Sequence, residues 1–333
     1  MAAERGGGRV TLRDVALAAN VSTTTVSDSL NGNGSLPEKT RQRVRRIAVE
    51  LGYRPSVTAR SLRSGRTGIL VITMLPSDVD AESLWQVEYF MRVMAGAAIE
   101  ANQRGFLLTV APAQMQLDVA HDGLIAVDPA MGDELLAAAH RRGTPVSTVG
   151  RTDSAAASWV DNDWAGVVAE VLDHLQRAGS RRPMLVSPES PASYIHSVEH
   201  HFTSWCATRG VASRSVRIPG AFRPSVAHAA IRDILDGPDP PDALFVGLDQ
   251  LALAAESAAM DLGLRIPQDL MLVNIGDGAA IAHAAVPISV VELHAEDMGR
   301  AAVRMLIDQI ELDAEPRQEV VPGHLVVRSS SQR

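Results

Sequence analysis

The apolar positions of this 333-residue chain change their spacing near residue 68. Within residues 10–55 they recur every three or four residues, which is typical of amphipathic helices. From residue 68 onward, short apolar runs alternate with longer amphipathic stretches, the pattern of strands and helices in turn. The chain is therefore predicted to have a small all-α head, followed by an α/β body in which helices cover parallel sheets.

The head is expected to contain three helices with clear start and stop signals. Thr11 and Asp14 have the spacing of a capping box, and Asn20 suits the turn that ends the first helix. Ser22 opens a second helix, which ends in the Asn-Gly-Asn-Gly turn of residues 31–34, and a third follows residues 35–38. Two short helices joined by a tight turn and braced by a third form a helix-turn-helix unit, whose second helix enters the DNA major groove.

Charge divides the chain at the same place. Residues 1–66 hold 12 Lys and Arg against 5 Asp and Glu, a net +7, whereas the remainder holds 19 against 34, a net −15. The two values give the overall −8. A compact basic head offers a favourable field to a polyanion, and the acidic body does not oppose this because charges act over a Debye length of about 8 Å at physiological salt. Double-stranded DNA is the expected partner.

The body alternates its predicted elements in the order typical of parallel sheets. Strands are expected at 69–74, 106–110, 123–127, 145–149, 184–187, 216–218, 243–246 and 270–274. Helices are expected at 88–104, 164–178, 198–209, 226–236 and 251–262. Ligands of such folds bind at the carboxyl ends of the strands. One departure is the gap at 111–122, which is too short for a complete helical crossover, so we expect that edge to be trimmed.

The spacing of the head resembles the lactose/galactose-repressor (LacI/GalR) family of bacterial transcription regulators. The resemblance rests on Val10-Thr11-Leu12-x-Asp14-Val15-Ala16, Val21-Ser22-x-x-Thr25-Val26-Ser27-x-x-Leu30-Asn31, Glu50-Leu51-Gly52-Tyr53-x-Pro55 and Ala59-Arg60-x-Leu62. It implies a DNA-binding domain at 10–55 after a flexible leader at 1–9, and a hinge helix or linker at 56–66. It also implies a core at 67–333 for effector binding and dimerisation.

The resemblance assigns DNA contacts to individual positions of the head. It places Thr23, Thr24 and Asp28 against base edges and Leu62 in the minor groove as an apolar wedge. The remaining expected DNA-binding residues contact phosphates or supply positive charge. They are Thr11, Ser22, Thr25, Ser27, Asn31, Tyr53, Arg60 and Arg63. One departure matters: Asp28 stands where the family usually has Arg. Aspartate can accept from cytosine N4 but cannot pair with guanine as Arg does, so the operator should differ from the common family sequence.

The resemblance extends over the body and implies two lobes like those of periplasmic sugar-binding proteins, each a doubly wound parallel sheet. Lobe 1 would span about 67–161 and 293–320, and lobe 2 about 162–292 and 321–330. A cleft between them would hold a small-molecule effector. The implied effector-binding positions are Leu75, Tyr89, Phe90, Trp159, Asp161, Val198, Phe222, Leu248, Asp249, Gly276 and Asp277.

Three of these positions lack the polar group that sugar-binding relatives often carry. Val198 stands at an expected Arg, Leu248 at an expected Asn, and Gly276 at an expected carboxylate. Polar ligands lose affinity without such partners. We therefore favour an effector less polar than a simple sugar, or an empty cleft. The alternative is a register shift that brings His196, His200 or His201 to the position of the expected Arg.

Enzyme, metal and membrane signatures are absent from the sequence. His196 and His200 have metal-binding spacing, but no third ligand is evident, and the single Cys206 excludes an internal disulfide. No nucleophile elbow, signal peptide or bilayer-length apolar run occurs, so we expect a cytoplasmic protein without cofactors.

The favoured interpretation is a sequence-specific regulator acting as a repressor, a homodimer on a pseudo-palindromic double-stranded DNA operator. It leaves open whether an effector releases DNA or promotes its binding. The alternative is a small-molecule-binding protein with little specific DNA binding; an enzyme that uses the cleft ranks third.

Overall fold

The computed structural model describes residues 10–31, 36–51, 53, 66–74, 87–111 and 120–333. The chain divides into two compact units between Thr67 and Gly68, and each unit is described by itself. We refer to the first as the head and to the second as the core.

The head consists of α1 (Leu12–Ala19), α2 (Thr23–Asn31) and α3 (Glu38–Glu50). The predicted capping box is present: the backbone N–H and hydroxyl of Thr11 both donate to Asp14 Oδ2, at 2.8 and 2.7 Å. Asn20 ends α1 in the left-handed conformation, as predicted. All three helices turn apolar side chains inward, and the buried centre is Val15, Ala16, Ala19, Val26, Val44 and Ala48.

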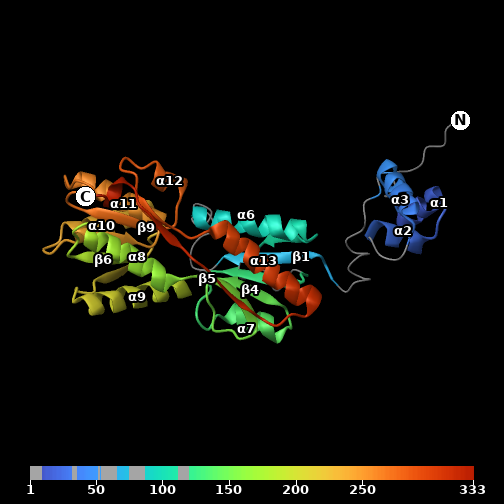
Figure 1. Ribbon diagram of the computed structural model, residues 1–333, viewed down its shortest axis with the longest axis horizontal. Helices are drawn as coiled ribbons and strands as arrows, with labels where there is room; N and C mark the ends of the chain where they lie inside the picture. The colour runs from blue at the N-terminus through green and yellow to red at the C-terminus, as the bar shows by residue number, and fades with distance from the viewer. Residues whose placement is uncertain (1–9, 32–35, 52, 54–65, 75–86, 112–119) are drawn as a thin grey trace. The chain divides into compact units, whose positions relative to one another are not determined.

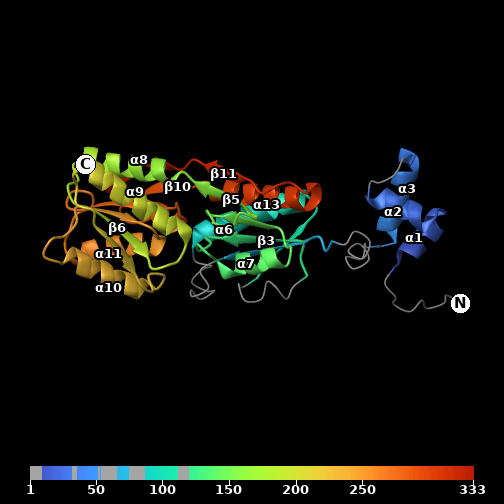
Figure 2. The same ribbon diagram turned by 90° about the horizontal axis from the view of Figure 1, so that it is seen from below.

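The first lobe of the core is a six-stranded parallel sheet in the order β11-β5-β4-β3-β1-β2. Its strands are β1 (Ile69–Met74), β2 (Leu107–Val110), β3 (Gly123–Val127), β4 (Val146–Val149), β5 (Ala157–Asn162) and β11 (Gln318–Val321). Alternate residues of β1 and β3 face opposite layers. Figures 1 and 2 show α6 (Glu88–Gln103) and α13 (Ala295–Leu312) over one face and α7 (Glu134–Arg141) over the other.

The second lobe is a six-stranded sheet in the order β12-β10-β9-β8-β6-β7, in which only β12 is antiparallel to its neighbour. Its strands are β6 (Pro183–Pro188), β7 (Ser215–Ile218), β8 (Ala243–Val246), β9 (Met271–Ile275), β10 (Ser289–Glu292) and β12 (His324–Val326). Its helices are α8 (Trp164–Arg177), α9 (Ser193–Arg209), α10 (Pro224–Leu235), α11 (Asp249–Asp261), the short α12 (Ala279–Ala282) and a 3-10 turn at Ser329–Ser331. Helices α8 and α9 pack on one face, and α10 and α11 on the other.

The predicted fold class is therefore correct, but several elements were not anticipated. The hydrophobic pattern did not identify α7, β5, α13 or the strands after residue 288 as elements. Helix α9 begins at Ser193, five residues before its predicted start at 198. Most of the short connection at 111–122 and most of the expected hinge at 56–66 lie outside the described residues.

The chain passes between the lobes three times: from β5 to α8, from β10 to α13, and from β11 to β12. Asn162, at the end of β5 and 2 % exposed, joins all three passages. Its side-chain amide donates to the carbonyl oxygens of Leu293 at 3.1 Å and Val321 at 3.0 Å. These segments are far apart in sequence, so the two hydrogen bonds hold the crossovers together where the lobes meet.

Helices α6 and α13 cross at unusually short range because a glycine stands on each. A methyl group at Gly96 would overlap the backbone of Glu296, and one at Gly299 would overlap the backbone of Val93. The crossing brings the start of α6 beside the segment that enters α13. Residues of α6 and of the segment that enters α13 therefore lie near the space between the two lobes.

We expect Asn162→Ala to lower the free energy of unfolding of the core by roughly 2 kcal/mol or more, because two hydrogen bonds are lost and two carbonyl oxygens remain without their partner. Urea denaturation followed by circular dichroism measures this change. The exposed Asn102, on α6, provides the control: Asn102→Ala should change stability by at most about 0.5 kcal/mol. Equal effects of the two variants would contradict the joining role of Asn162.

Candidate functional site

The N-terminal end of α2 presents a row of hydroxyls. Ser22, Thr23 and Thr24 are exposed, whereas Thr25 and Asp28 are half-buried. Ser22 Oγ accepts the backbone N–H of Thr25 at 3.0 Å and lies 2.9 Å from Thr25 Oγ1, so Ser22 caps α2. Free backbone N–H groups and the helix dipole make this end attractive to phosphate.

The other head positions predicted to contact DNA differ in their surroundings. Thr11 is exposed and holds the capping box of α1. Ser27 is only 5 % exposed, which leaves little of its hydroxyl for a phosphate. Tyr53 packs against the buried centre of the head, and Asn31 is the last residue of α2. Arg60, Leu62 and Arg63 lie outside the described residues.

Helix α3 contributes part of the positive charge of the head. This helix carries Lys39, Arg41, Arg43, Arg45 and Arg46 against Glu38 and Glu50. The pair between Arg46 and Glu50, at 3.6 Å, is exposed and contributes little to stability. The helix therefore adds positive potential to the head, besides packing Val44 and Ala48 into its buried centre.

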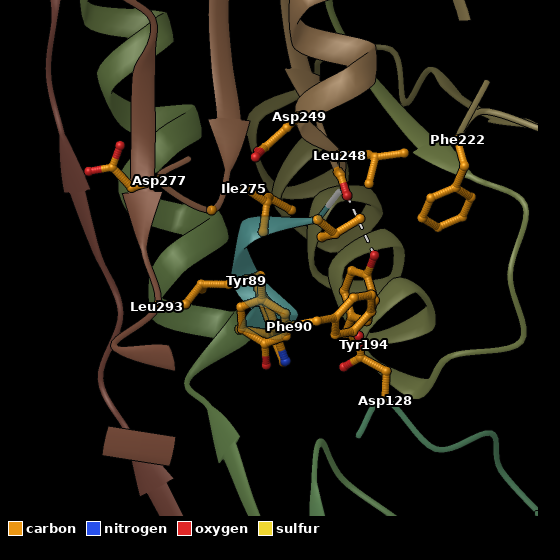
Figure 3. Close-up of a pocket in the computed structure, with 14 residues that line it drawn as sticks. Tyr89, Phe90, Asp128, Tyr194, Phe222, Leu248, Asp249, Ile275, Asp277 and Leu293 are labelled. Atoms are coloured by element: carbon orange, nitrogen blue, oxygen red, sulfur yellow. Dashed lines mark hydrogen bonds between the residues drawn. The ribbon is translucent and has the colours of Figure 1, made fainter. Parts of the chain in front are cut away.

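A pocket of about 580 Å³, including the part open to solvent, lies between the two lobes. Most of its wall comes from residues that directly follow a strand or lie near the start of a helix. Figure 3 shows these side chains converging from both lobes. The lining residues are Val87, Tyr89, Phe90, Asp128, Trp164, Tyr194, Phe222, Gly247, Leu248, Asp249, Ile275, Gly276, Asp277 and Leu293.

Asp128 is the carboxylate of the first lobe in this pocket. It follows β3 directly, has a left-handed backbone (φ 53°) and is 8 % exposed. Its backbone N–H donates to the carbonyl of Val149 at 2.8 Å, but within the described chain its carboxylate has no hydrogen bond or ion pair. Burial, reinforced by the neighbouring Asp161, raises the pKa of Asp128 to about 8.

Asp161 lies behind Asp128 at the end of β5 and is 2 % exposed. It accepts the indole N–H of Trp164 and the backbone N–H of Asn162, both at 2.9 Å, and Arg151 lies 3.6 Å away. Burial raises its pKa to about 6, against the lowering effect of these partners. The guanidinium of Arg151 also stacks over the Trp159 ring, 4.6 Å from its centroid.

The second lobe contributes two carboxylates with different partners. Asp249, at the start of α11, accepts from the side-chain amide of Asn274 at 2.6 Å. Burial raises its pKa to about 6, and nearby Glu88 and Asp277 add to this. Asp277 is neutralised by Arg328, whose guanidinium contacts both carboxylate oxygens at 2.8 Å.

The structure brings some of the predicted effector positions together and separates others. At the pocket wall lie Tyr89, Phe90, Phe222, Leu248, Asp249, Gly276 and Asp277. Val198 lies in the core of the second lobe, packed with α8 and α9, and Trp159 is covered by Arg151. Asp161 contacts the wall residue Trp164 but does not itself line the pocket. Leu75 lies outside the described residues.

Sequence reasoning missed seven wall residues, which are Val87, Asp128, Trp164, Tyr194, Gly247, Ile275 and Leu293. Asp128 had a usable signal, because it is a polar residue immediately after a fully buried strand. Trp164 and Tyr194 stand at the first turns of α8 and α9, and the late predicted start of α9 concealed Tyr194.

The residues weighed as metal ligands or nucleophiles occupy ordinary surroundings. His196 Nδ1 lies 3.4 Å from the carbonyl of Ala192, and Cys206 is buried in the second lobe, where burial raises its pKa. In the part of the chain that the structure covers, no three metal-ligating side chains come together. None of the helices described there has the length and apolarity that a bilayer span requires.

A helix-turn-helix head joined to a two-lobed core with an interlobe pocket defines a DNA-binding regulator of the ligand-sensing type. The sequence profile described as "Bacterial regulatory proteins, lacI family" matches residues 11–56, and that of the "Periplasmic binding protein-like domain" matches residues 172–331. The chain therefore combines a lacI-family helix-turn-helix domain with a periplasmic-binding-protein-like domain, as bacterial regulators of the lacI family do.

Similar proteins support this assignment over nearly the whole chain. The HTH-type transcriptional regulator CelR of Thermobifida fusca is 27% identical over 97% of this chain and 98% of its own length. The repressor MelR of Bacillus subtilis is 25% identical over 96% and 97%. The solved CelR–cellobiose complex has a TM-score of 0.71 at 26% identity, covering 97% of this chain and 100% of that one. A Lac repressor dimer bound to operator, with a TM-score of 0.82 at 20% identity over 98% and 100%, shares the fold.

We expect Asp128→Asn to make the core relatively more stable as pH rises from about 4 to about 8. In this window folded Asp128 keeps a proton that the unfolded chain has lost, so its contribution to stability is present at low pH and disappears as pH passes its folded pKa of about 8. Asp161, Tyr89 and Tyr194 also face this group and remain in the variant.

Urea denaturation of the wild type and the variant between pH 5 and pH 8 measures the effect as a difference in unfolding free energy. The matched control is Asp233→Asn, at an exposed position of α10, which should show a pH-independent difference. A constant difference for Asp128→Asn as well would show that Asp128 is ionised throughout.

Proposed function

We propose that this chain is a repressor that binds a pseudo-palindromic operator in double-stranded DNA as a homodimer, and that a small molecule in the interlobe pocket alters its affinity for DNA. The lacI-family match over residues 11–56 carries the proposal, because it places the family spacing on α1 and α2 of a basic head. The exposed Ser22, Thr23 and Thr24 supply the hydroxyls that this role requires.

In this proposal α2 reads the major groove from its N-terminal end. Thr23 and Thr24 are free to reach base edges or phosphates, and Ser22 combines a capping role with a phosphate contact. Asp28, half-buried on the same helix, accepts from the exocyclic amine of cytosine where an Arg would bind guanine. Arg60, Leu62 and Arg63 are assigned to the minor groove by the family resemblance alone.

Apolar side chains on the first lobe support a dimer. Met91 and Ile99 are 43% and 41% exposed, eight residues apart on α6, and so lie on one face of that helix. Leu107 and Val110 are 57% and 42% exposed on β2, the edge strand of the first sheet. Exposed apolar edge strands invite pairing and are usually covered, and a second copy of the chain would cover this one.

The effector role rests on the pocket between the lobes. CelR, a relative with 26% identity in its solved form, binds cellobiose. Here the wall of the corresponding two-lobed core is aromatic and acidic, and Leu248 and Gly276 lie in it where polar groups were expected. We therefore favour an effector other than a simple sugar. A ligand that contacts both lobes changes how the two lobes are arranged relative to each other. Through the hinge, this change alters the affinity for DNA.

Selection of bound sequences from a random double-stranded DNA pool tests the DNA-reading role. We expect a pseudo-palindromic consensus, and Asp28→Arg should shift one position in each half-site towards guanine because Arg donates two hydrogen bonds to its N7 and O6. The discrimination gained should be about 1 to 3 kcal/mol.

The matched control is Glu50→Arg at the exposed end of α3, which makes the same charge change away from α2. It should strengthen binding to all sequences alike and leave the consensus unchanged. Equal binding of random and selected DNA at physiological salt by the wild type would instead favour a small-molecule-binding protein with little specific DNA binding.

Leu107→Glu should weaken self-association at least tenfold, because it places a charge from each copy into the proposed dimer interface. Sedimentation equilibrium of the full chain over a range of concentrations measures the dissociation constant. Leu312→Glu is the control, since Leu312 is 72% exposed at the end of α13. A wild-type chain that stays monomeric at micromolar concentration, or an unchanged Leu107→Glu dimer, would rule out this interface.

A further inference from the structure

The interlobe pocket combines three carboxylates and five aromatic rings without a basic side chain in the described wall. We propose that its effector is an organic cation, a protonated amine on an apolar or aromatic body, held between Asp128 of the first lobe and Asp249 of the second. This inference rests on the proposed effector role of the pocket and names the chemistry of the ligand.

The wall supplies hydrogen-bond acceptors and almost no donors. Among its described residues there is no Lys, Arg, His, Asn or Gln. Of its two phenols, Tyr194 donates to the carbonyl of Gly247 at 3.4 Å, and the hydroxyl of Tyr89 faces Met298 Sδ at 4.0 Å. A sugar hydroxyl both donates and accepts, so the hydroxyl oxygens of a sugar would find few hydrogen-bond donors in this wall. An ammonium group only donates and needs none.

The surroundings of Asp128 give the most direct indication that the pocket favours a positively charged ligand. Asp128 as a residue is 8 % exposed and lines the pocket, and its carboxylate has no hydrogen bond or ion pair in the described chain. Burying a carboxylate without a counter-charge is costly unless it takes up a proton or meets a cation. The raised pKa of Asp128 records that cost in the ligand-free protein.

The guanidinium groups around the pocket are already engaged with other carboxylates. Arg328 pairs with Asp277, Arg151 with Asp161, and Arg92 with Glu292 at 3.3 Å. Within the described residues, Asp128 and Asp249 are therefore the two wall carboxylates that have no paired cation.

The aromatic residues suit the remainder of such a ligand. Tyr89 and Phe90 meet edge to face with ring centroids 5.7 Å apart, and Trp164 and Tyr194 lie 5.8 Å apart. In Figure 3 the ring of Tyr194 stands between Asp128 and the start of α11, where Asp249 lies. Ring faces attract cations and also bury apolar carbon. A metal ion is disfavoured, because no three metal-ligating side chains converge in the described chain.

Matched pairs of ligands test the charge requirement on the full-length protein. The pairs are 2-phenylethylamine with 2-phenylethanol, tyramine with 4-(2-hydroxyethyl)phenol, and 1,4-diaminobutane with 1,4-butanediol; cellobiose and glucose complete the panel. Titration calorimetry and thermal shift should show at least one amine binding tenfold or more tightly than its alcohol. The inference is overturned if no amine exceeds its alcohol by threefold, or if a sugar binds more tightly than every amine.

Two variants locate the binding. Asp128→Asn and Asp249→Asn should each weaken the best amine at least tenfold and leave its alcohol within threefold, because only the charge is removed. Asp233→Asn, on the exposed face of α10, should change neither affinity. Thermal unfolding of each ligand-free variant shows whether it is folded. Unchanged amine binding in folded Asp128→Asn would place the cation elsewhere and refute the assignment.

The same proteins separate this inference from the proposed function. Specific DNA binding together with the absence of any amine preference would overturn the ligand class and leave the regulator intact. Amine binding without specific DNA binding would overturn the regulator and leave the ligand class intact. Where both hold, the amine should change the dissociation constant for the selected operator, and its alcohol should not.

Discussion

The two-lobed core depends on the hydrogen bonds that the Asn162 side chain donates to Leu293 and Val321. Each lobe is a sheet with its own helices, so only three chain passages connect them, and this one buried amide joins all three. Asp161, the preceding residue, holds Trp164 in the pocket wall and places negative charge beside Asp128. The residues that connect the lobes therefore also shape the electrostatics of the interlobe pocket.

The head and the fold class could be predicted because their signals are local. The Thr11–Asp14 capping box, the turn at Asn20 and the inward face of α1 depend on residues within a few positions of one another. The burial of Ser27 could not be read in the same way, because it depends on how the helices of the head pack together. Helix α13 also escaped prediction as an element, although its spacing is regular, and its close crossing with α6 through Gly96 and Gly299 is a property of two segments about 200 residues apart.

The location of the pocket at the ends of the strands was predicted better than the residues that form its wall. Parallel strands end at one edge, so residues after β8 and β9 were expected to meet, and Leu248, Asp249, Gly276 and Asp277 do so. Family spacing transferred poorly within α9, where Val198 belongs to the core while Tyr194, one turn earlier, lines the wall. Polar residues that follow buried strands are the most transferable signal, and Asp128 is the one that this rule would have added.

The charge contrast between head and core takes on a more specific meaning in the structure. Helix α3 adds a lysine and four arginines to the positive charge of the head, a field suited to any polyanion, whereas the proposed base discrimination is assigned to a few side chains of α2. In the core, the carboxyl groups of Asp128 and Asp249 lie in the pocket between the lobes, and among the described residues neither pairs with a cation. Burial of such carboxylates costs less once a proton or a cation neutralises them. On the proposed ligand chemistry, binding of a cation would therefore supply the positive charge that the described wall lacks.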